Sequence, residues 1–87
     1  MSWPEAEEWC SSIGMTMPTM KEMCPSWDGN IGIGVCHELN GKGGDVSVWS
    51  ATARDSDNAF YVHLSTGTVS YEFMLQLPDL YYYAFCH

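Results

Sequence analysis

Basic residues are scarce in this chain. Only Lys21, Lys42 and Arg54 oppose eleven acidic residues, which gives a formal net charge of −8. Proteins that bind nucleic acids or anionic membranes need clustered cations to neutralise phosphates. We therefore expect neither nucleic acid nor an anionic membrane surface among the partners of this protein.

Long apolar runs are also missing. No stretch approaches the roughly 18–20 apolar residues that span a bilayer, and no basic segment followed by an apolar one marks a signal peptide at the start. We expect a single domain over residues 1–87 that does not insert into a membrane; if it is secreted, its export signal lies upstream of Met1. A domain this small buries only roughly 60–65% of its unfolded surface, so covalent cross-links help to stabilise it.

Signatures of catalysis and metal binding are absent from the sequence. No Gly-x-Ser-x-Gly or equivalent frames a nucleophile, and the cysteines and histidines show no zinc-ligand spacing. His37, His63 and His87 lie far apart in sequence, which favours surface or cross-strand positions over metal ligation. We expect no enzyme activity, no metal and no cofactor.

One acidic loop leaves an alternative open. Asp28, Asn30, Glu38 and Asp45 lie in a glycine-rich stretch and either gather around a cation or form a solvated acidic loop. The register does not match an EF-hand, because Gly32 falls where an oxygen ligand is needed. The solvated loop is the favoured interpretation.

Four cysteines stand out against these absences: Cys10, Cys24, Cys36 and Cys86. Without metal-site spacing, they indicate disulfides in a small domain of an oxidising, extracellular compartment. Four cysteines allow three pairings, and their spacing alone does not choose among them.

The first segment predicts an amphipathic helix. Ser2 and Glu5 have capping-box spacing, Pro4 suits the first turn, and Gly14 is a natural stop. Apolar side chains recur at helical spacing and predict one buried stripe: Ala6, Trp9, Cys10 and Ile13.

A short second helix is predicted next. Thr19 and Glu22 repeat the capping-box spacing, and Pro25 ends the segment. The methionines around it either form an adaptable apolar patch or fill the core, and their spacing favours the core: Met15, Met17, Met20 and Met23.

The rest of the chain predicts a loop and then strands. Residues 28–45 are rich in glycine and form a loop with a short extended piece at Ile31, Ile33 and Val35. Alternating apolar residues then predict strands from about Val46, around Phe60–Leu64, around Val69–Phe73 and from about Leu80 to Cys86, with turns at 65–67 and 78–79. We expect an α+β fold in which two N-terminal helices pack on an antiparallel β meander.

This organisation resembles the C-type lectin-like fold in its bacterial form. The similar segments are Ser2–Cys10 with Gly14, Met17-Pro18-Thr19-Met20-Lys21-Glu22-Met23, Val48-Trp49-Ser50-Ala51-Thr52, Asn58–Val62 and Gly67-Thr68-Val69-Ser70-Tyr71. The resemblance implies one disulfide from the first helix to the last strand, Cys10–Cys86, and hence a second one, Cys24–Cys36. It also implies a ligand-binding domain of surface, pilin-like or retroelement-diversified proteins.

The sugar-binding branch of that family is not matched. Neither Glu-Pro-Asn nor Gln-Pro-Asp occurs in the loop, and no Trp-Asn-Asp follows in a later strand. These motifs supply oxygen atoms to Ca²⁺ in that branch, so calcium-dependent sugar binding is not expected here.

The aromatic residues of the second half are the candidate binding residues. If Cys86 faces the first helix, Tyr82 and Ala84 face inward by the two-residue period, and Tyr81, Tyr83 and Phe85 face outward. Leucines around Pro78 add apolar surface in a predicted loop. The predicted ligand-binding residues are Trp49, Arg54, Asp55, Asp57, Asn58, Tyr61, His63, Tyr71, Phe73, Leu75, Leu77, Asp79, Tyr81 and Tyr83.

We expect a non-catalytic extracellular recognition domain that binds a protein or glycan through residues 49–83. The alternative is a structural module, such as the globular head of a pilin-like subunit, whose exposed aromatic residues contact a neighbouring copy. That alternative would make the domain a homo-oligomer.

Overall fold

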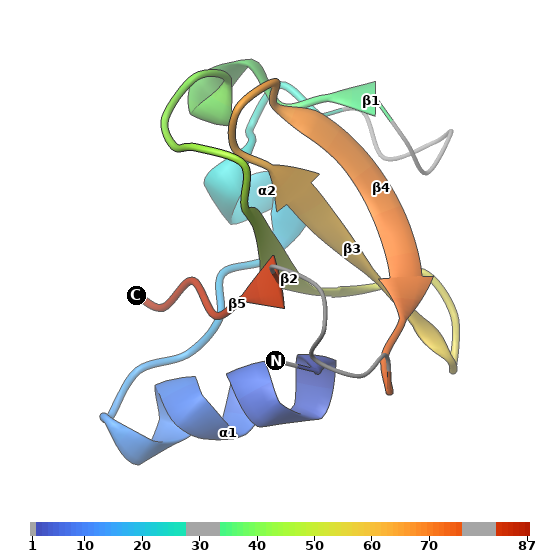
Figure 1. Ribbon diagram of the computed structural model, residues 1–87. Helices are drawn as coiled ribbons and strands as arrows, with labels where there is room; N and C mark the ends of the chain where they lie inside the picture. The colour runs from blue at the N-terminus through green and yellow to red at the C-terminus, as the bar shows by residue number, and fades with distance from the viewer. Residues whose placement is uncertain (1, 28–33, 76–81) are drawn as a thin grey trace.

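The computed structural model describes residues 2–27, 34–75 and 82–87 (Figure 1). Its helices are α1 (Trp3–Ser12) and α2 (Met20–Met23), with a 3₁₀ turn at His37–Leu39. Its strands are β1 (Gly34–Val35), β2 (Ser47–Ala53), β3 (Asn58–His63), β4 (Thr68–Phe73) and β5 (Tyr82–Tyr83). The α+β class predicted from the sequence is confirmed.

Both helices begin at the predicted capping boxes. The Glu5 amide donates to Ser2 Oγ at 3.4 Å, and the Ser2 amide donates to Glu5 Oε1 at 2.8 Å. Thr19 and Glu22 make the same reciprocal pair at 3.1 and 2.8 Å. Hydrogen bonds to the backbone amides of Ser2 and Thr19 lower the pKa of the Glu5 and Glu22 carboxyls from their ordinary value of 4.5.

The sheet is mixed, with strand order β1-β4-β3-β2-β5. The contacts from β1 to β4, β4 to β3 and β3 to β2 are antiparallel, but β5 runs parallel to β2 with Val48 opposite Tyr83. The prediction of a purely antiparallel meander was therefore wrong in its last strand. After β4 the chain crosses to the opposite edge of the sheet, which brings β5 in parallel to β2.

Two apolar clusters lie on opposite faces of this sheet. Phe60 and Val62 of β3 belong to the cluster with α2, whereas Ala59 and Tyr61 belong to the cluster with α1. Successive side chains of a strand point to opposite faces, so each helix covers a different face. We call these the α2 face and the α1 face; Figure 1 shows α1 below the strands and apart from α2.

The four methionines in and around α2 differ in their burial. Met17 on the α1 face and Met20 and Met23 on the α2 face are buried, which confirms that they fill the core. Met15 differs, because 45% of its side chain is exposed.

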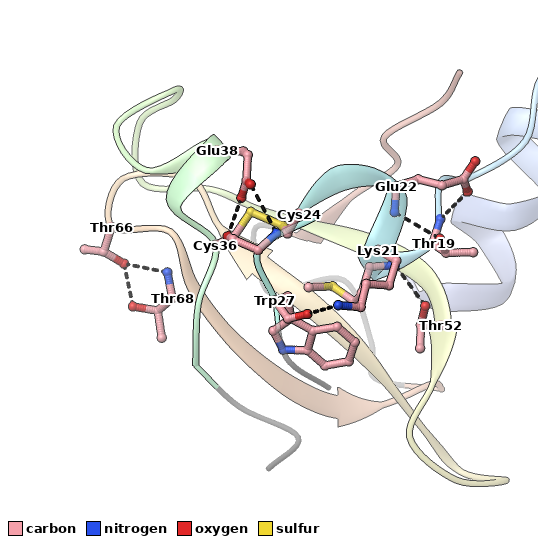
Figure 2. Close-up of a disulfide and its surroundings, with 12 residues drawn as sticks. Thr19, Lys21, Glu22, Cys24, Trp27, Cys36, Glu38, Thr52, Thr66 and Thr68 are labelled. Carbon is pink, nitrogen blue, oxygen red and sulfur yellow. Dashed lines mark hydrogen bonds between the residues drawn. A yellow bond between two sulfur atoms is a disulfide. The ribbon is translucent and has the colours of Figure 1, made fainter. Parts of the chain in front are cut away.

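Each face carries one disulfide. Cys10 joins Cys86 on the α1 face, with Cα atoms 5.5 Å apart, and Cys24 joins Cys36 on the α2 face, with Cα atoms 5.4 Å apart. This is the pairing implied by the resemblance. Figure 2 shows the Cys24–Cys36 bond between α2 and the 3₁₀ turn. The two bonds fit an oxidising compartment.

The buried stripe of α1 is narrower than predicted. Ala6 and Cys10 are fully buried, but Trp9 is 52% exposed and Ile13 is 47% exposed. The small side chain of Ala6 and the disulfide at Cys10 hold α1 close to the sheet along a single line. This line leaves Trp9 and Ile13 on the solvent side.

The predicted glycine-rich loop contains short regular pieces. Val35 lies in β1 opposite Thr68, and a 3₁₀ turn follows Cys36, whereas Ile31 and Ile33 lie outside the described residues. The Cys36 amide donates to the Gly67 carbonyl at 2.6 Å. Gly67 has φ of 73°, and a Cβ at this position would lie 2.5 Å from the Cys36 carbonyl oxygen, so glycine is required for this contact.

Within the described residues, no helix has the length and apolar character needed to cross a bilayer.

Candidate functional site

The turn between β2 and β3 is held by one carboxylate. Asp55 Oδ1 accepts hydrogen bonds from the amides of Asp57 and Asn58 at 2.8 and 2.9 Å and from Asn58 Nδ2 at 3.0 Å. The amide of Asp57 first, and then the side chain of Asn58, lower the pKa of Asp55 from its ordinary value of 3.8. An Asx turn of this kind fixes the direction of the side chains around it.

Arg54 is oriented by this turn and by β4. Its guanidinium carbon lies 4.0 Å from the centre of the Tyr71 ring, and its Nη1 lies 3.3 Å from Asp55 Oδ2. The side chain of Arg54 remains 44% exposed. It therefore presents an ordered positive charge to solvent beside an aromatic ring.

Exposed apolar side chains continue along β4. Tyr71 lies opposite Phe60 and contacts it edge to face at 6.4 Å, and Phe73 lies opposite Asn58. Paired residues share a face, so both rings belong to the α2 face of the sheet. Tyr71 is 38% exposed, Phe73 44% and Leu75, beyond the strand end, 62%.

We call this group the hairpin surface. It consists of Arg54, Asp55, Asn58, Tyr71, Phe73 and Leu75. These six residues were predicted from the sequence. They lie around the turn between β2 and β3 and the neighbouring C-terminal part of β4. The exposed Asp57 lies in the same turn.

Trp49 was predicted as a ligand contact, but its ring is fully buried. It contacts Tyr61 and Tyr82 edge to face, at 6.2 and 5.1 Å, inside the α1-face cluster. β2 lies between β3 and β5 and is covered on both faces, so Trp49 has no solvent side. It is a core residue and does not belong to the hairpin surface.

Tyr61 and Tyr82 are half-buried neighbours on the α1 face, with ring centres 4.6 Å apart. Burial, and then hydrogen bonding with Tyr61, raise the pKa of the Tyr82 phenol. Their position sets Tyr61 apart from the hairpin surface, because the two lie on opposite faces of the sheet.

The remaining predicted residues are dispersed. His63 lies at the other end of β3, 3.2 Å from an Asp45 carboxylate oxygen and 3.3 Å from Ser47 Oγ. Tyr83 is 46% exposed on β5, which is separated from β4 by β3 and β2. Leu77, Asp79 and Tyr81 lie outside the described residues. The predicted alternation holds for the described part of the last segment, since Tyr83 and Phe85 are exposed and Tyr82 and Ala84 are not.

The acidic residues of the glycine-rich region have protein partners. Glu38 accepts from the Ser26 hydroxyl and amide at 2.8 and 3.2 Å beside the disulfide (Figure 2), and Asp45 pairs with His63. Asp28 and Asn30 lie outside the described residues. Over the described ranges, the one metal-like grouping is Cys24, Cys36 and Glu38, whose sulfur atoms are already joined in a disulfide.

Sequence reasoning missed a second exposed region, along α1. Trp9 and Ile13 were assigned to the buried stripe and Met15 to the core, and Glu7 and Glu8 were not predicted as site residues. Two hollows border this helix. The available signal was the position of Glu5, Glu7 and Glu8 directly before Trp9 in the sequence.

Comparisons with protein-family models, with curated proteins and with solved structures find no match to this chain.

Proposed function

We propose that the protein is a bacterial C-type lectin-like domain that acts as a non-catalytic recognition module at the cell surface. Its ligand is a protein or a glycan, bound through the hairpin surface, and it serves adhesion or receptor binding. The family assignment is supported by the quoted motifs together with the α+β layers and the two disulfides. Secretion is supported by the same bonds.

The observation that carries this proposal is the ordered exposure of Arg54 and Tyr71. Tyrosine and arginine are enriched at binding hot spots. A tyrosine ring offers a large contact area and few conformations to lose, and an arginine that is already held in place loses less freedom on binding than a free one. Here the Tyr71 ring packs against Phe60, and the Arg54 guanidinium forms an ion pair with Asp55. Phe73 and Leu75 extend the surface with apolar area, which either stacks on a sugar ring or packs on a protein.

The test is a binding screen with matched variants. The biotinylated domain is applied to a glycan array and to a library of displayed extracellular proteins. For any ligand found, Tyr71→Ala and Phe73→Ala are each expected to weaken binding about tenfold or more. Tyr83→Ala, which removes a similarly exposed ring from the distant edge of the sheet, is the control and is expected to change affinity less than about twofold. Equal losses in all three variants would contradict the proposed surface.

A second candidate function is supported by the sheet edges. Val35 on β1 is 43% exposed and Tyr83 on β5 is 46% exposed, so both outermost strands display apolar side chains. Such edges suit lateral contact between copies, as in the head of a pilin-like subunit. Sedimentation of the isolated domain distinguishes the two functions. Concentration-dependent association that Tyr83→Ser weakens would favour assembly, and a monomer at all concentrations would favour recognition.

A further inference from the structure

Three exposed apolar side chains lie on the solvent side of α1 and just beyond its end: Trp9, Ile13 and Met15. Trp9 and Ile13 are one turn apart, and both are about half exposed, as is Met15 beyond the helix end. Exposed apolar groups that cluster in this way mark contact surfaces more often than isolated ones do.

Two hollows run beside this apolar strip. The larger has a volume of about 590 Å³ and is bordered by Pro4, Glu7, Glu8 and Met15, with the buried Met17 also lining it. The smaller, of about 350 Å³, is formed by Glu5, Glu8, Trp9 and Ser12. Glu8 borders both hollows, so the two share one acidic residue.

The walls of the hollows carry uncompensated negative charge. Over the described part of the chain, Glu7 and Glu8 make no side-chain hydrogen bond and no ion pair, whereas Glu5 is bonded to Ser2. α1 contains no basic residue. A hollow that combines carboxylates with methionine or tryptophan is complementary to a long cationic side chain, whose alkyl stem is apolar and whose head is charged.

We propose that the solvent face of α1 is a docking surface for a basic segment of a partner protein. One lysine or arginine of that segment enters the larger hollow, where its stem contacts Met15 and Met17 and its head bonds to Glu7 and Glu8. A second one crosses the indole of Trp9 and reaches Glu5 and Glu8. This surface is separate from the hairpin surface, which lies on the opposite face of the sheet.

A second copy of this chain does not supply such a segment. Of its three basic residues, Lys21 bonds to the carbonyl of Trp27 and Arg54 is held by Tyr71 and Asp55 (Figure 2 shows the Lys21 contact). They are also far apart in sequence, so they form no basic segment. The charge therefore points to a different protein as the occupant.

The test uses a defined basic peptide, acetyl-Lys-Ala-Lys-Ala-Lys-amide, titrated into ¹⁵N-labelled protein at low salt. The expected result is a set of amide shift changes confined to residues 5–17 and Ala51. The double variant Glu7→Gln/Glu8→Gln is expected to weaken binding about five- to tenfold, and Trp9→Ala about two- to fivefold. The peptide with acetylated lysines is expected not to bind.

The control separates docking from general attraction to an acidic protein. Asp45→Asn/Asp57→Asn removes the same amount of charge away from α1 and is expected to change affinity less than about 1.5-fold. An equal loss in this control, shift changes centred elsewhere, or absence of binding at millimolar peptide would each overturn the proposal. The amide spectrum of each variant confirms that it is folded. Failure of this test would not contradict the proposed role of the hairpin surface, because that role is tested separately with Tyr71→Ala and Phe73→Ala.

Discussion

The guanidinium of Arg54 lies over the ring of Tyr71, with its central carbon 4.0 Å from the ring centre. Arg54 follows the end of β2, and Tyr71 lies in β4, with β3 between these strands. The contact therefore spans the start of β3 and connects the β2–β3 hairpin to the β3–β4 hairpin. Both groups remain partly exposed, so the same contact that orders them also presents them to solvent.

Replacing Arg54 by alanine is expected to lower the free energy of unfolding by about 0.5–1 kcal/mol, the usual contribution of an exposed cation–π contact. Lys42→Ala is the matched control and is expected to change it by less than about 0.5 kcal/mol. Urea unfolding followed by tryptophan fluorescence measures both. In a double-mutant cycle with Tyr71→Leu, the coupling should account for most of the loss from Arg54. A coupling near zero would show that the ring and the guanidinium do not stabilise each other.

The protein is expected to lose stability in acid. The pKa values of Glu5, Glu22, Glu38 and Asp55 are lowered on folding, mainly because each carboxylate accepts backbone hydrogen bonds. A lowered pKa contributes stability that is present above the ordinary values of 4.5 for Glu and 3.8 for Asp and is lost as the pH falls through the folded-state values. The melting temperature should therefore fall as the pH is reduced from about 5 to about 3.

The helix caps provide the matched test of this acid dependence. Glu5→Gln/Glu22→Gln keeps groups that can accept the cap hydrogen bonds but removes the titration. The fall in melting temperature should be smaller in this variant than in the original protein. An identical fall in both would rule out the caps as a source of the acid dependence.

Loss of the two disulfides is expected to differ in cost. The Cys10–Cys86 bond closes a separation of 76 residues and the Cys24–Cys36 bond one of 12. In the chain-entropy description their removal costs about 4 and about 3 kcal/mol respectively. Unfolding of the paired Cys→Ala variants in urea measures this order. A larger cost for Cys24–Cys36 would indicate that native packing, and not chain entropy, dominates.

Substitution of Trp49 is expected to destabilise the protein more than substitution of Trp9. Trp49→Ala should cost about 3–5 kcal/mol, because it empties a fully buried site next to Tyr61 and Tyr82. Trp9→Ala should cost less, about 1–2 kcal/mol, because half of its side chain already lies in water. Thermal unfolding of the two variants checks this. A large loss from Trp9→Ala would mean that α1 depends on that ring for packing.

Local features of the fold were predictable from the sequence because local chemistry determines them. The reciprocal bonds of Ser2 with Glu5 and of Thr19 with Glu22 need only residues that are three apart. The alternation in β4 was equally visible, since its more exposed and less exposed residues alternate over most of the strand, whereas in β3 the neighbours Ala59 and Phe60 are both buried. The hairpin surface followed from these strands, as its members lie at the strand ends.

Features that depend on distant partners were not predictable in this way. Ser47, Val48, Trp49 and Ser50 are all buried, because β2 is covered on both faces, and no alternation reports this. The parallel pairing of β5 depends on which edge the returning chain reaches, and a two-residue strand carries no signal for that choice. The exposure of Trp9 likewise depends on how closely Ala6 and Cys10 approach the sheet.

The Cys10–Cys86 bond also determines how the domain would carry mechanical tension. The bond holds the two Cα atoms 5.5 Å apart, so a pull applied at the two ends of the chain passes from Cys10 directly to Cys86. The sheet, α2 and the hairpin surface lie within the closed loop. Outside the loop, the hydrogen bonds from Trp3 to the carbonyls of Met74 and Ser50 are the contacts with the sheet that such a pull would strain first. A force that straightens the first turns of α1 would break these hydrogen bonds, but the chain between Cys10 and Cys86 would stay closed until the sulfur–sulfur bond is reduced.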